Sequence, residues 1–530
     1  MHADLLLING RVITFAGRPC EGLAIIRDRI AATGTTPDIL PLRGPRTKVI
    51  DLRGRLAVPG FTDSHVHLAA LASRLSAVKL ESAASLSEAL RRVAAHARAL
   101  PRGEWITGGG FDKNRWGDAF PTRHDLDRVA PHHPVALRTR DGHSVWANSL
   151  ALERCGIRRG ARAPNGGVVL KDAKGEPTGI LQETAIRLLY ACPEYRERDP
   201  TDEQLVAAQR FLIRQGVTSV HLMEEARVFE ALQRLRASGD LLLRATVYRS
   251  LGELDDLIAA GAMSGLGDEW LRIGGVKMLI DGSLGSQTAW MFEPYANAPQ
   301  AGRGVPTMSR ADLREAVGRA SRAGIACAIH AIGDRANAEV LDALETVRDM
   351  PTPLPHRIEH AQLLRRRDIG RFARLGAIAS MQPCHILGDI DPAERYWGKR
   401  SRYAYAVRSL LASGATLAFG SDAPVETANP LAGLFAAVMR QSSDGQPVGG
   451  WYRKEEGIGV TEALRCYCLG PAVATGEAQF KGRLAPGCLA DVVVLSEDIA
   501  RMRGRALLRV KVDLAMVGGR VRYRRRGATR

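Results

Sequence analysis

The sequence predicts an α/β protein built around eight parallel strands and the helices that connect them. Between about residues 58 and 479, short runs rich in apolar and β-branched residues alternate with stretches of helical periodicity. This alternation is typical of repeated strand–helix units, in which consecutive strands run parallel. Polar residues able to bind metals follow several of these strands, as they do at the active ends of barrels. A (β/α)8 TIM barrel fits this pattern, although the strand count alone does not exclude an open, doubly wound sheet.

The first predicted barrel strand begins at Val58 and ends in the polar sequence D-S-H-V-H. The other seven strands are predicted at 217–222, 242–249, 271–280, 325–330, 356–360, 376–381 and 415–420. The segment 68–200 is far too long for one loop between a strand and a helix. We therefore expect it to form an inserted subdomain over the mouth of the barrel.

Both ends of the chain carry the patterns of short strands. Residues 3–15 contain two apolar runs around Asn9-Gly10, which predicts a hairpin, and 512–523 repeat the pattern around Gly518-Gly519. A further strand is predicted at 490–495. Because exposed strand edges need partners, residues 1–57 and 480–526 are expected to form one small composite domain beside the barrel domain of residues 58–479.

Size and composition indicate a folded globular protein. The chain has 530 residues, of which 45% are hydrophobic and 25% charged, so more than one domain is expected and a disordered or fibrous protein is not. The net charge is +17, but the positive residues are spread along the chain and form a dense run only at 520–530. Scattered charge of this kind does not indicate a protein that binds nucleic acid.

Cysteine usage and hydropathy bear on where the protein works. The eight cysteines lie far apart and form no C-x-x-C pair, so neither a zinc ribbon nor a small disulfide framework is expected. Residues 1–15 lack the basic start of a signal peptide, and no run reaches the roughly 18 apolar residues that a membrane helix needs. We expect a cytoplasmic protein that binds neither a membrane nor nucleic acid.

His65 and His67 are the first candidate metal ligands. Because successive side chains of a strand point to opposite faces, these two histidines lie on one face and Val66 on the other. Two imidazoles on one face can bind one metal ion. The pair alone fits two packed histidines near a strand end equally well.

Four more candidates lie at the ends of later strands: Lys277 in the fourth, His330 and His360 at the ends of the fifth and sixth, and Asp422 just after the eighth. Each has a structural explanation by itself, such as a packed histidine, a helix cap at Asp422, or a lysine that pairs with Asp281. Together they are difficult to explain by packing, because each buried polar group would need its own partner. A lysine in a dry site can also lose its proton and react with carbon dioxide, and the resulting carbamate has two oxygens that can bridge two metals.

These residues carry a resemblance to a known family. H-V-H at 65–67, Lys277, His330, His360 and Asp422, in that order, resemble the metal-binding set of the amidohydrolase superfamily. Motifs along nearly the whole chain are similar to the amidohydrolase 3 group, which includes enzymes like N-substituted formamide deformylase: D-G-H at 141–143, G-V-K-M-L-I-D-G-S at 275–283, I-H-A-I-G-D at 329–334, R-I-E-H-A-Q at 357–362, M-Q-P-C-H at 381–385 and F-G-S-D-A-P-V at 419–425. The resemblance implies a distorted (β/α)8 barrel joined to a small β-sandwich built from both termini.

The resemblance also implies a divalent metal centre. One ion would be held by His65, His67 and Asp422, a second by His330 and His360, and carboxylated Lys277 would bridge the two. Zinc, with one or two ions per chain, is the first choice, because imidazole and carboxylate ligands with an open position suit it. Iron, manganese and nickel fit the same ligands.

The reaction implied is hydrolysis of a carbon–nitrogen bond in a small non-peptide amide, such as an N-formyl, N-acyl or cyclic amide. A metal-bound water has its pKa lowered toward about 7, so hydroxide is available to attack the carbonyl. Asp422 would carry the proton to the leaving amine, and His143 would stabilise the oxyanion. The candidates for contact with the substrate are Asp112, Trp116, Asp281 and His385.

Two other classes of function stay open. The same metals can act as Lewis acids in a decarboxylase or an isomerase, without attack by water. A non-catalytic binding protein with the same fold is disfavoured, because a metal-binding type of residue is present at every expected ligand position. The sequence gives neither the substrate nor the oligomeric state, for which a homodimer is the prior expectation.

Overall fold

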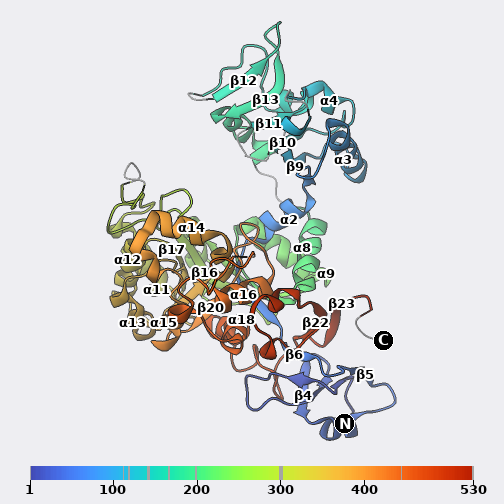
Figure 1. Cartoon of the computed structure of the whole chain (residues 1–530), viewed down its shortest axis with the longest axis vertical. Helices are drawn as coiled ribbons and strands as arrows, with labels where there is room; N and C mark the ends of the chain where they lie inside the picture. The colour runs from blue at the N-terminus through green and yellow to red at the C-terminus, as the bar shows by residue number, and fades with distance from the viewer. Residues whose placement is uncertain are drawn as a thin grey trace. The chain divides into compact units, whose positions relative to one another are not determined.

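The computed structural model describes residues 2–111, 113–116, 120–139, 144–164, 167–196, 200–297, 302–442 and 444–527. The chain divides into two compact units, which are drawn in Figure 1. The barrel unit consists of Met1–Leu71 and Leu205–Arg530, and the insert unit consists of Ala72–Gln204.

The barrel unit contains a sheet of eight parallel strands, each bonded to its neighbour along the chain. The strands are β7 (Phe61–Val66), β14 (Val217–Met223), β15 (Arg244–Ser250), β16 (Leu271–Leu279), β17 (Cys327–Ala331), β18 (Arg357–His360), β19 (Ile378–Met381) and β20 (Leu417–Phe419). Apart from a few residues near their ends, these strands are buried, as expected where helices cover a parallel sheet. The predicted eight-stranded barrel is confirmed.

Helices lie between the barrel strands and after the last of them. They are α2 (Leu68–Ser76), α8 (Asp202–Arg214), α9 (Ala226–Ser238), α10 (Leu254–Ala259), α11 (Arg310–Arg322), α12 (Asp334–Glu345), α13 (Arg366–Leu375), α14 (Ile386–Trp397), α15 (Val407–Ala412), α16 (Pro430–Met439), α17 (Arg453–Glu456) and α18 (Val460–Ala474). Local sequence sets their ends: α13, for example, stops at Gly376, whose φ of 64° is costly for other residues. Among the described residues, no helix has the length and apolar content needed to cross a membrane.

Two smaller sheets complete the barrel unit and combine both ends of the chain. The first contains β1 (Leu5–Ile8), β3 (Gly22–Ile26), β4 (Arg29–Gly34) and β5 (Lys48–Asp51), next to the short helix α1 (Thr36–Ile39). The second contains β2 (Arg11–Val12), β6 (Leu56–Pro59), β21 (Val492–Leu495), β22 (Val512–Val517) and β23 (Arg520–Arg524). Leu7 and Ile25 of the first sheet share one apolar core with Val492 and Leu514 of the second. The expected small β-sandwich built from both termini is confirmed, as is the hairpin at Gly518-Gly519.

The hairpin predicted at Asn9-Gly10 is wrong. β1 pairs with β3 and β5 in the first small sheet, whereas β2 pairs with β6 in the second. Asn9 has a φ of 54°, so the two residues do turn the chain, but the turn carries it from one sheet to the other. Turn chemistry predicted the change of direction correctly and the strand partners wrongly.

The strand predicted from Val58 onward is divided in two. β6 ends at Pro59 and pairs with β21 in the small sheet, and β7 begins at Phe61 and pairs with β14 in the barrel. Gly60 lies between them, where a Cβ atom would be 2.1 Å from Thr218 Oγ1. Only glycine fits at this crossing, so the apolar run that reads as one strand serves two sheets.

The insert unit has a six-stranded sheet of its own, in the order β12-β13-β11-β10-β9-β8. Its elements are β8 (Val78–Lys79), β9 (Ile106–Phe111), β10 (Val135–Thr139), β11 (Ser144–Ala147), β12 (Gly167–Lys171), β13 (Pro177–Glu183), α3 (Leu86–Ala99), α4 (Arg123–Asp127), α5 (Ser149–Arg154), α6 (Arg187–Tyr190) and α7 (Pro193–Arg196). Alternate residues of β10 and β11 enter two separate apolar cores, so both faces of the sheet are covered. The domain limits drawn from the sequence stay a prediction, because α2 and α8 run across the two ends of this unit.

The barrel closes between β7 and the segment that follows β20. Asp422 N donates a hydrogen bond to His65 O (2.7 Å), and His67 N donates to Ala423 O (3.0 Å). Gly420 permits this approach, because a Cβ atom there would lie 2.5 Å from His65 N. The closure therefore brings the first and last barrel strands into direct contact at the end where both carry candidate ligands.

Replacing Gly420 by alanine tests the closure. We expect Gly420→Ala to lower the free energy of unfolding by about 1–3 kcal/mol, because the added methyl group pushes against the backbone of β7. Gly370→Ala is the matched control: Gly370 lies within α13 with open space around it, so alanine should stabilise the protein by about 0.5–1 kcal/mol. Chemical denaturation measures both changes, and equal effects of the two substitutions would contradict this account.

Candidate metal centre

The candidate ligands lie at the carboxyl end of the barrel, where barrels carry their active sites. His65 and His67 come at the end of β7, and Asp422 follows β20. Lys277 lies near the end of β16, His330 in β17, and His360 is the last residue of β18. All six belong to the barrel unit.

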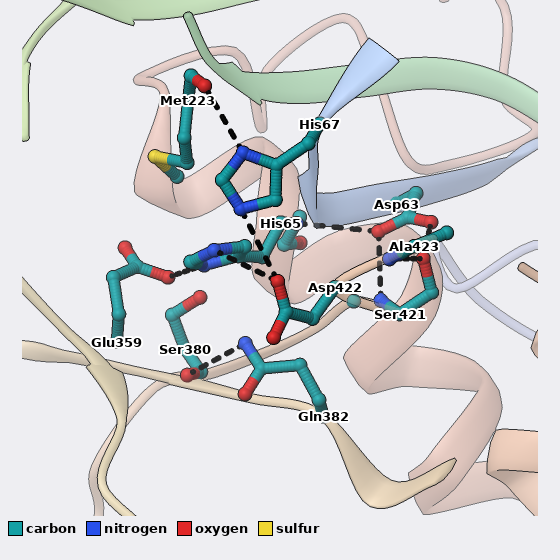
Figure 2. A network of polar contacts seen from close by, with 12 residues as sticks. Asp63, His65, His67, Met223, Glu359, Ser380, Gln382, Ser421, Asp422 and Ala423 are labelled. Atoms are coloured by element: carbon teal, nitrogen blue, oxygen red, sulfur yellow. Dashed lines mark hydrogen bonds and ion pairs between the residues drawn. The ribbon is translucent and has the colours of Figure 1, made fainter. Parts of the chain in front are cut away.

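His65, His67 and Asp422 form the tightest group. Their ligand atoms all lie within 4.8 Å of one another. Asp422 Oδ1 is 3.5 Å from His65 Nε2 and 3.3 Å from His67 Nε2. Figure 2 shows both imidazole rings directed toward this carboxylate. Three nitrogen and oxygen donors thus face one small volume.

Hydrogen bonds on the far side of each ring fix its orientation. His65 Nδ1 lies 2.6 Å from Glu359 Oε2, and His67 Nδ1 donates to the carbonyl oxygen of Met223 (3.2 Å). Each bond places a proton on Nδ1, so Nε2 is the atom left to bind a cation. Such outer hydrogen bonds are a regular feature of metal-binding histidines.

His330 and His360 continue the site from the first group. The His360 ring centroid is 5.0 Å from that of His65 and 4.5 Å from that of His330. His330 Nε2 donates to the carbonyl oxygen of Gly282 (3.0 Å). Its Nδ1 is therefore the nitrogen that can bind a metal. The structure therefore brings together the four histidines that the sequence predicted as ligands.

Lys277 is partly buried beside these groups. Burial lowers its pKa to about 8, while Glu359 and Asp422 favour the charged ammonium. With this pKa, about a tenth of the molecules carry Lys277 as the neutral amine at pH 7. Neutral amine is the form that reacts with carbon dioxide.

The electrostatics of the pocket suit a cation. Burial, together with the charge of Lys277, holds the pKa of His65 well below its usual value and lowers that of His330 to about 4. Both imidazoles are therefore neutral, as metal ligands must be. Although burial alone would have the opposite effects, the His67–Asp422 contact raises the pKa of His67 and lowers that of Asp422. The imidazole of His67 thus faces the carboxylate of Asp422, and the donor set fits a divalent cation.

Two buried acidic residues that sequence reasoning missed support the ligands. Glu359 is fully buried and accepts from Arg357 Nε (2.5 Å) as well as from His65. Burial would raise the pKa of Glu359, but the Arg357 guanidinium lowers it, so the carboxylate stays charged. The signal was present in R-I-E-H: Arg357 and Glu359 alternate along a buried strand that ends in a ligand.

Asp63 is the second of these acidic residues, and it joins β7 to the last strand. Its carboxylate accepts from Ser421 N (2.8 Å), Ser421 Oγ (2.5 Å) and His65 N (3.2 Å). Burial raises the pKa of Asp63 to about 6, in spite of these donors. Asp63 therefore holds the residue before Asp422 in place, as Figure 2 shows.

Two ligands have unusual backbone conformations. His360 has a φ of 70° and Asp422 a φ of 59°, both in the left-handed region that residues other than glycine rarely adopt. Residues held in this way cost about 1–3 kcal/mol each and tend to occur at functional sites.

The predicted substrate contacts have different surroundings. His385 lies in the barrel unit, with Nε2 buried, without a hydrogen bond among the described residues, and 3.6 Å from Asp422 Oδ2. Asp281 is buried and accepts from the backbone N–H groups of Trp290, Ile332 and Gly333, which ties two loops together. These bonds favour a structural role for Asp281 over contact with substrate.

The remaining predicted residues lie in the insert. Trp116 stacks on Phe111 with a centroid distance of 5.1 Å, and its Nε1 donates to Ala83 O (3.1 Å), both within the insert unit. Asp112 and His143 lie outside the described residues. Their predicted roles stay predictions.

Replacing Glu359 by glutamine tests the orientation of His65. We expect Glu359→Gln to weaken divalent-metal binding by about 10–100-fold, because the ring loses its charged partner. Glu477→Gln is the matched control: Glu477 is a buried carboxylate paired with Lys481 Nζ (3.0 Å) and contacts no candidate ligand. Metal competition with a coloured chelator measures the affinities, and a similar loss in both variants would show that Glu359 has no specific role.

Comparisons with known proteins agree with this geometry. The chain is 33% identical over 516 residues to the protein LONG AFTER FAR-RED 3 of Arabidopsis thaliana, covering 94% of this chain and 88% of that protein. It is 30% identical over 546 residues to the N-substituted formamide deformylase of Arthrobacter pascens, covering 99% of both. A crystal structure of an uncharacterized metal-dependent hydrolase from Pyrococcus horikoshii OT3 is similar with a TM-score of 0.77 and 30% identity, over 94% of this chain and 98% of that one.

A sequence model of the amidohydrolase family matches residues 48–523. The match includes all the barrel strands and all six candidate ligands. The resemblance expected from the motifs is confirmed, and the chain belongs to the amidohydrolase family.

Proposed function

We propose that this protein is a metal-dependent hydrolase that cleaves a carbon–nitrogen bond other than a peptide bond in a small amide-type substrate. The observation that carries the proposal is the approach of the ligand atoms of His65, His67 and Asp422 to within 4.8 Å at the carboxyl end of the barrel. Membership of the amidohydrolase family supports hydrolysis. The full-length similarity to a formamide deformylase supports an amide as the substrate.

Zinc is the metal we propose, because the centre offers imidazole and carboxylate donors. His65, His67 and Asp422 would hold one ion, and His330 and His360 a second. When bound, such a metal lowers the pKa of a water molecule toward about 7 and polarises a carbonyl group.

The two oxygens of Asp422 have different surroundings, which suits a residue with two tasks. Oδ1 faces His65 and His67, whereas Oδ2 faces His385. Contacts to the histidines hold the pKa of Asp422 low, so the carboxylate is ionised and able to accept a proton from the attacking water. The same group then gives this proton to the leaving amine. His385, whose Nε2 is buried 3.6 Å from Oδ2, is placed to hydrogen-bond either this carboxylate or the substrate carbonyl.

Lys277 is proposed to react with carbon dioxide, and the resulting carbamate would offer two oxygens to metal held by the neighbouring ligands. The neutral amine attacks the carbon of carbon dioxide, an N–C bond forms, the electron pair of one C=O π bond moves to oxygen, and the amine proton passes to water. The lowered pKa of Lys277 favours this step, because more of the side chain is neutral. The carbamate replaces a cation by an anion among the neutral histidines, which strengthens the attraction for divalent metal.

Replacing Asp422 by asparagine tests the reaction. The protein, purified without chelators, is assayed for metal content and for amine release from a panel of N-formyl, N-acyl and cyclic amides. We expect Asp422→Asn to lose several orders of magnitude in turnover while it keeps most of its metal, because the proton acceptor is lost and the histidines remain. Asp268→Asn, an exposed aspartate paired with Arg236, is the control and should retain full activity.

Water labelled with oxygen-18 separates hydrolysis from the alternatives. A hydrolase must place the label in the carboxylate product, whereas a decarboxylase or an isomerase does not. Turnover without label would contradict the proposal, and so would a metal-loaded protein that releases amine from no member of the panel.

Carbon-13 bicarbonate tests the carbamate. We expect a carbamate signal in the carbon-13 spectrum of the wild-type protein and none in Lys277→Arg, which keeps the charge but does not react in this way. Protein prepared without carbon dioxide should bind less metal, and bicarbonate should restore the binding. A spectrum without the signal, together with metal binding that ignores bicarbonate, would mean that Lys277 acts as a plain amine.

A further inference from the structure

A basic cavity lies between α8 and β23, outside the metal centre. Its volume is about 700 Å³, and its lining consists of Arg210, Ile213, Arg214, Leu242, Val521, Arg522, Tyr523, Arg524 and Arg526. Five of these nine residues are arginines and none is acidic. The cavity joins the barrel to the composite sheet, as the neighbouring positions of α8 and β23 in Figure 1 indicate.

This cavity and the metal centre lie toward opposite ends of the barrel. Arg214 ends α8 and comes just before β14, which starts at Val217. Met223, at the other end of the same strand, accepts the hydrogen bond from His67. Seven residues of strand separate these two points, a length of about 20 Å. A ligand in the cavity would therefore not be part of the reaction site.

Four of the five arginines of the cavity are exposed to solvent, and the fifth, Arg522, is partly buried. Within the part of the chain that the structure describes, none of the five forms an ion pair with a carboxylate. Arg210 and Arg214 are one helical turn apart, a spacing at which like charges repel. By contrast, Arg525, which does not line the cavity, is paired with Asp513 at 2.8 Å. Positive charge is concentrated where carboxylates are missing.

Arg522 is the most constrained of these residues. Its Nε is buried and has no hydrogen-bond partner among the described residues. Burial and the nearby charge of Arg520 both lower the pKa of Arg522, so the guanidinium is held in an unfavourable position. A buried donor without an acceptor is unfavourable, and an anion in the cavity would accept from it and relieve the repulsion between the arginines.

Two simpler explanations do not account for the whole cluster. Charges on an edge strand such as β23 can prevent aggregation, but Arg210 and Arg214 belong to a helix and line the same cavity. A nucleic-acid surface is an extended basic stripe with several aromatic side chains, whereas this one is concave and contains only Tyr523.

We propose that this cavity binds an oligophosphate anion with two or three linked phosphate groups. The planar guanidinium group bonds phosphate oxygens in pairs, and five guanidiniums exceed what one phosphate, with up to about two negative charges, can neutralise. The volume also lies within the range of about 300–1,000 Å³ that is usual for small-ligand pockets. Arg210 and Arg214 come from α8, whereas the other three arginines lie in β23 or just after it. The ligand would therefore link the barrel to the composite sheet.

Tripolyphosphate is the probe for the test. Isothermal titration calorimetry measures its binding to the full chain, and thermal unfolding measures the stabilisation that binding produces. The variants are Arg210→Gln/Arg214→Gln, on the helix, and Arg522→Gln, on the strand. Arg366→Gln/Arg367→Gln is the control, because it removes two exposed arginines from α13 and lowers the net charge equally.

We expect one tripolyphosphate per chain in the wild type and the control, with a raised unfolding temperature. Both cavity variants should bind at least about tenfold more weakly, because hydrogen bonds between charged groups are lost. All of these proteins keep the same metal centre, so any removal of metal by tripolyphosphate affects them alike. The experiment measures no hydrolysis and is independent of the proposed function.

Three results would overturn the proposal. Equal weakening of the control would mean that tripolyphosphate responds to net charge alone. Equal affinity for orthophosphate would indicate a site for a single phosphate. Displacement of tripolyphosphate by duplex DNA at lower concentration would identify the cavity as part of a nucleic-acid surface.

Discussion

The contact on which the rest of the structure depends is the closure of the barrel between β7 and the segment after β20. The two backbone hydrogen bonds of this closure involve His65, His67 and Asp422, which are also the three residues whose ligand atoms lie closest together. The residues that close the barrel are therefore the same residues that form the candidate metal centre. Asp63 strengthens the same junction by binding Ser421, and Gly420 leaves the space that it requires. A defect at this junction would damage stability and metal binding together.

A buried ion pair lies beside the centre. Arg357 and Glu359 are both fully buried, and a buried pair of this kind is often no more stabilising than apolar residues of similar size. The contact with His65 gives this pair a role beyond stability, because it fixes the orientation in which the Nε2 atom of the ring is directed at a cation. The lowered pKa values of His65 and His330 follow mainly from burial, which keeps these two imidazoles neutral and able to bind a metal. The buried pair therefore contributes little to stability, but it helps to hold the metal-binding nitrogen atoms in place before a cation binds.

The two ends of the barrel differ in electrostatic character. At the carboxyl end, positive and negative side chains are interleaved within hydrogen-bond distance, and each charge has a partner or a ligand role. Toward the amino end, α8 and β23 bring arginines together without carboxylates. The same scaffold thus offers a cation site at one end and an anion site at the other.

The sequence by itself determined which segments form the barrel strands, since apolar runs alternate with helical periodicity. It also indicated six candidate ligands, since H-V-H places two imidazoles on one strand face and the other four lie at or just after the ends of later strands. It did not determine pairing. The turn at Asn9-Gly10 was recognised but its two strands joined different sheets, and one apolar run became β6 and β7. Only the tertiary structure decided that Glu359 meets His65 and that Asp281 bonds backbone. The physical reason is the distance along the chain over which each signal acts. Periodicity within a segment shows which of its faces is buried, whereas contacts between residues hundreds of positions apart are determined by packing in the folded protein.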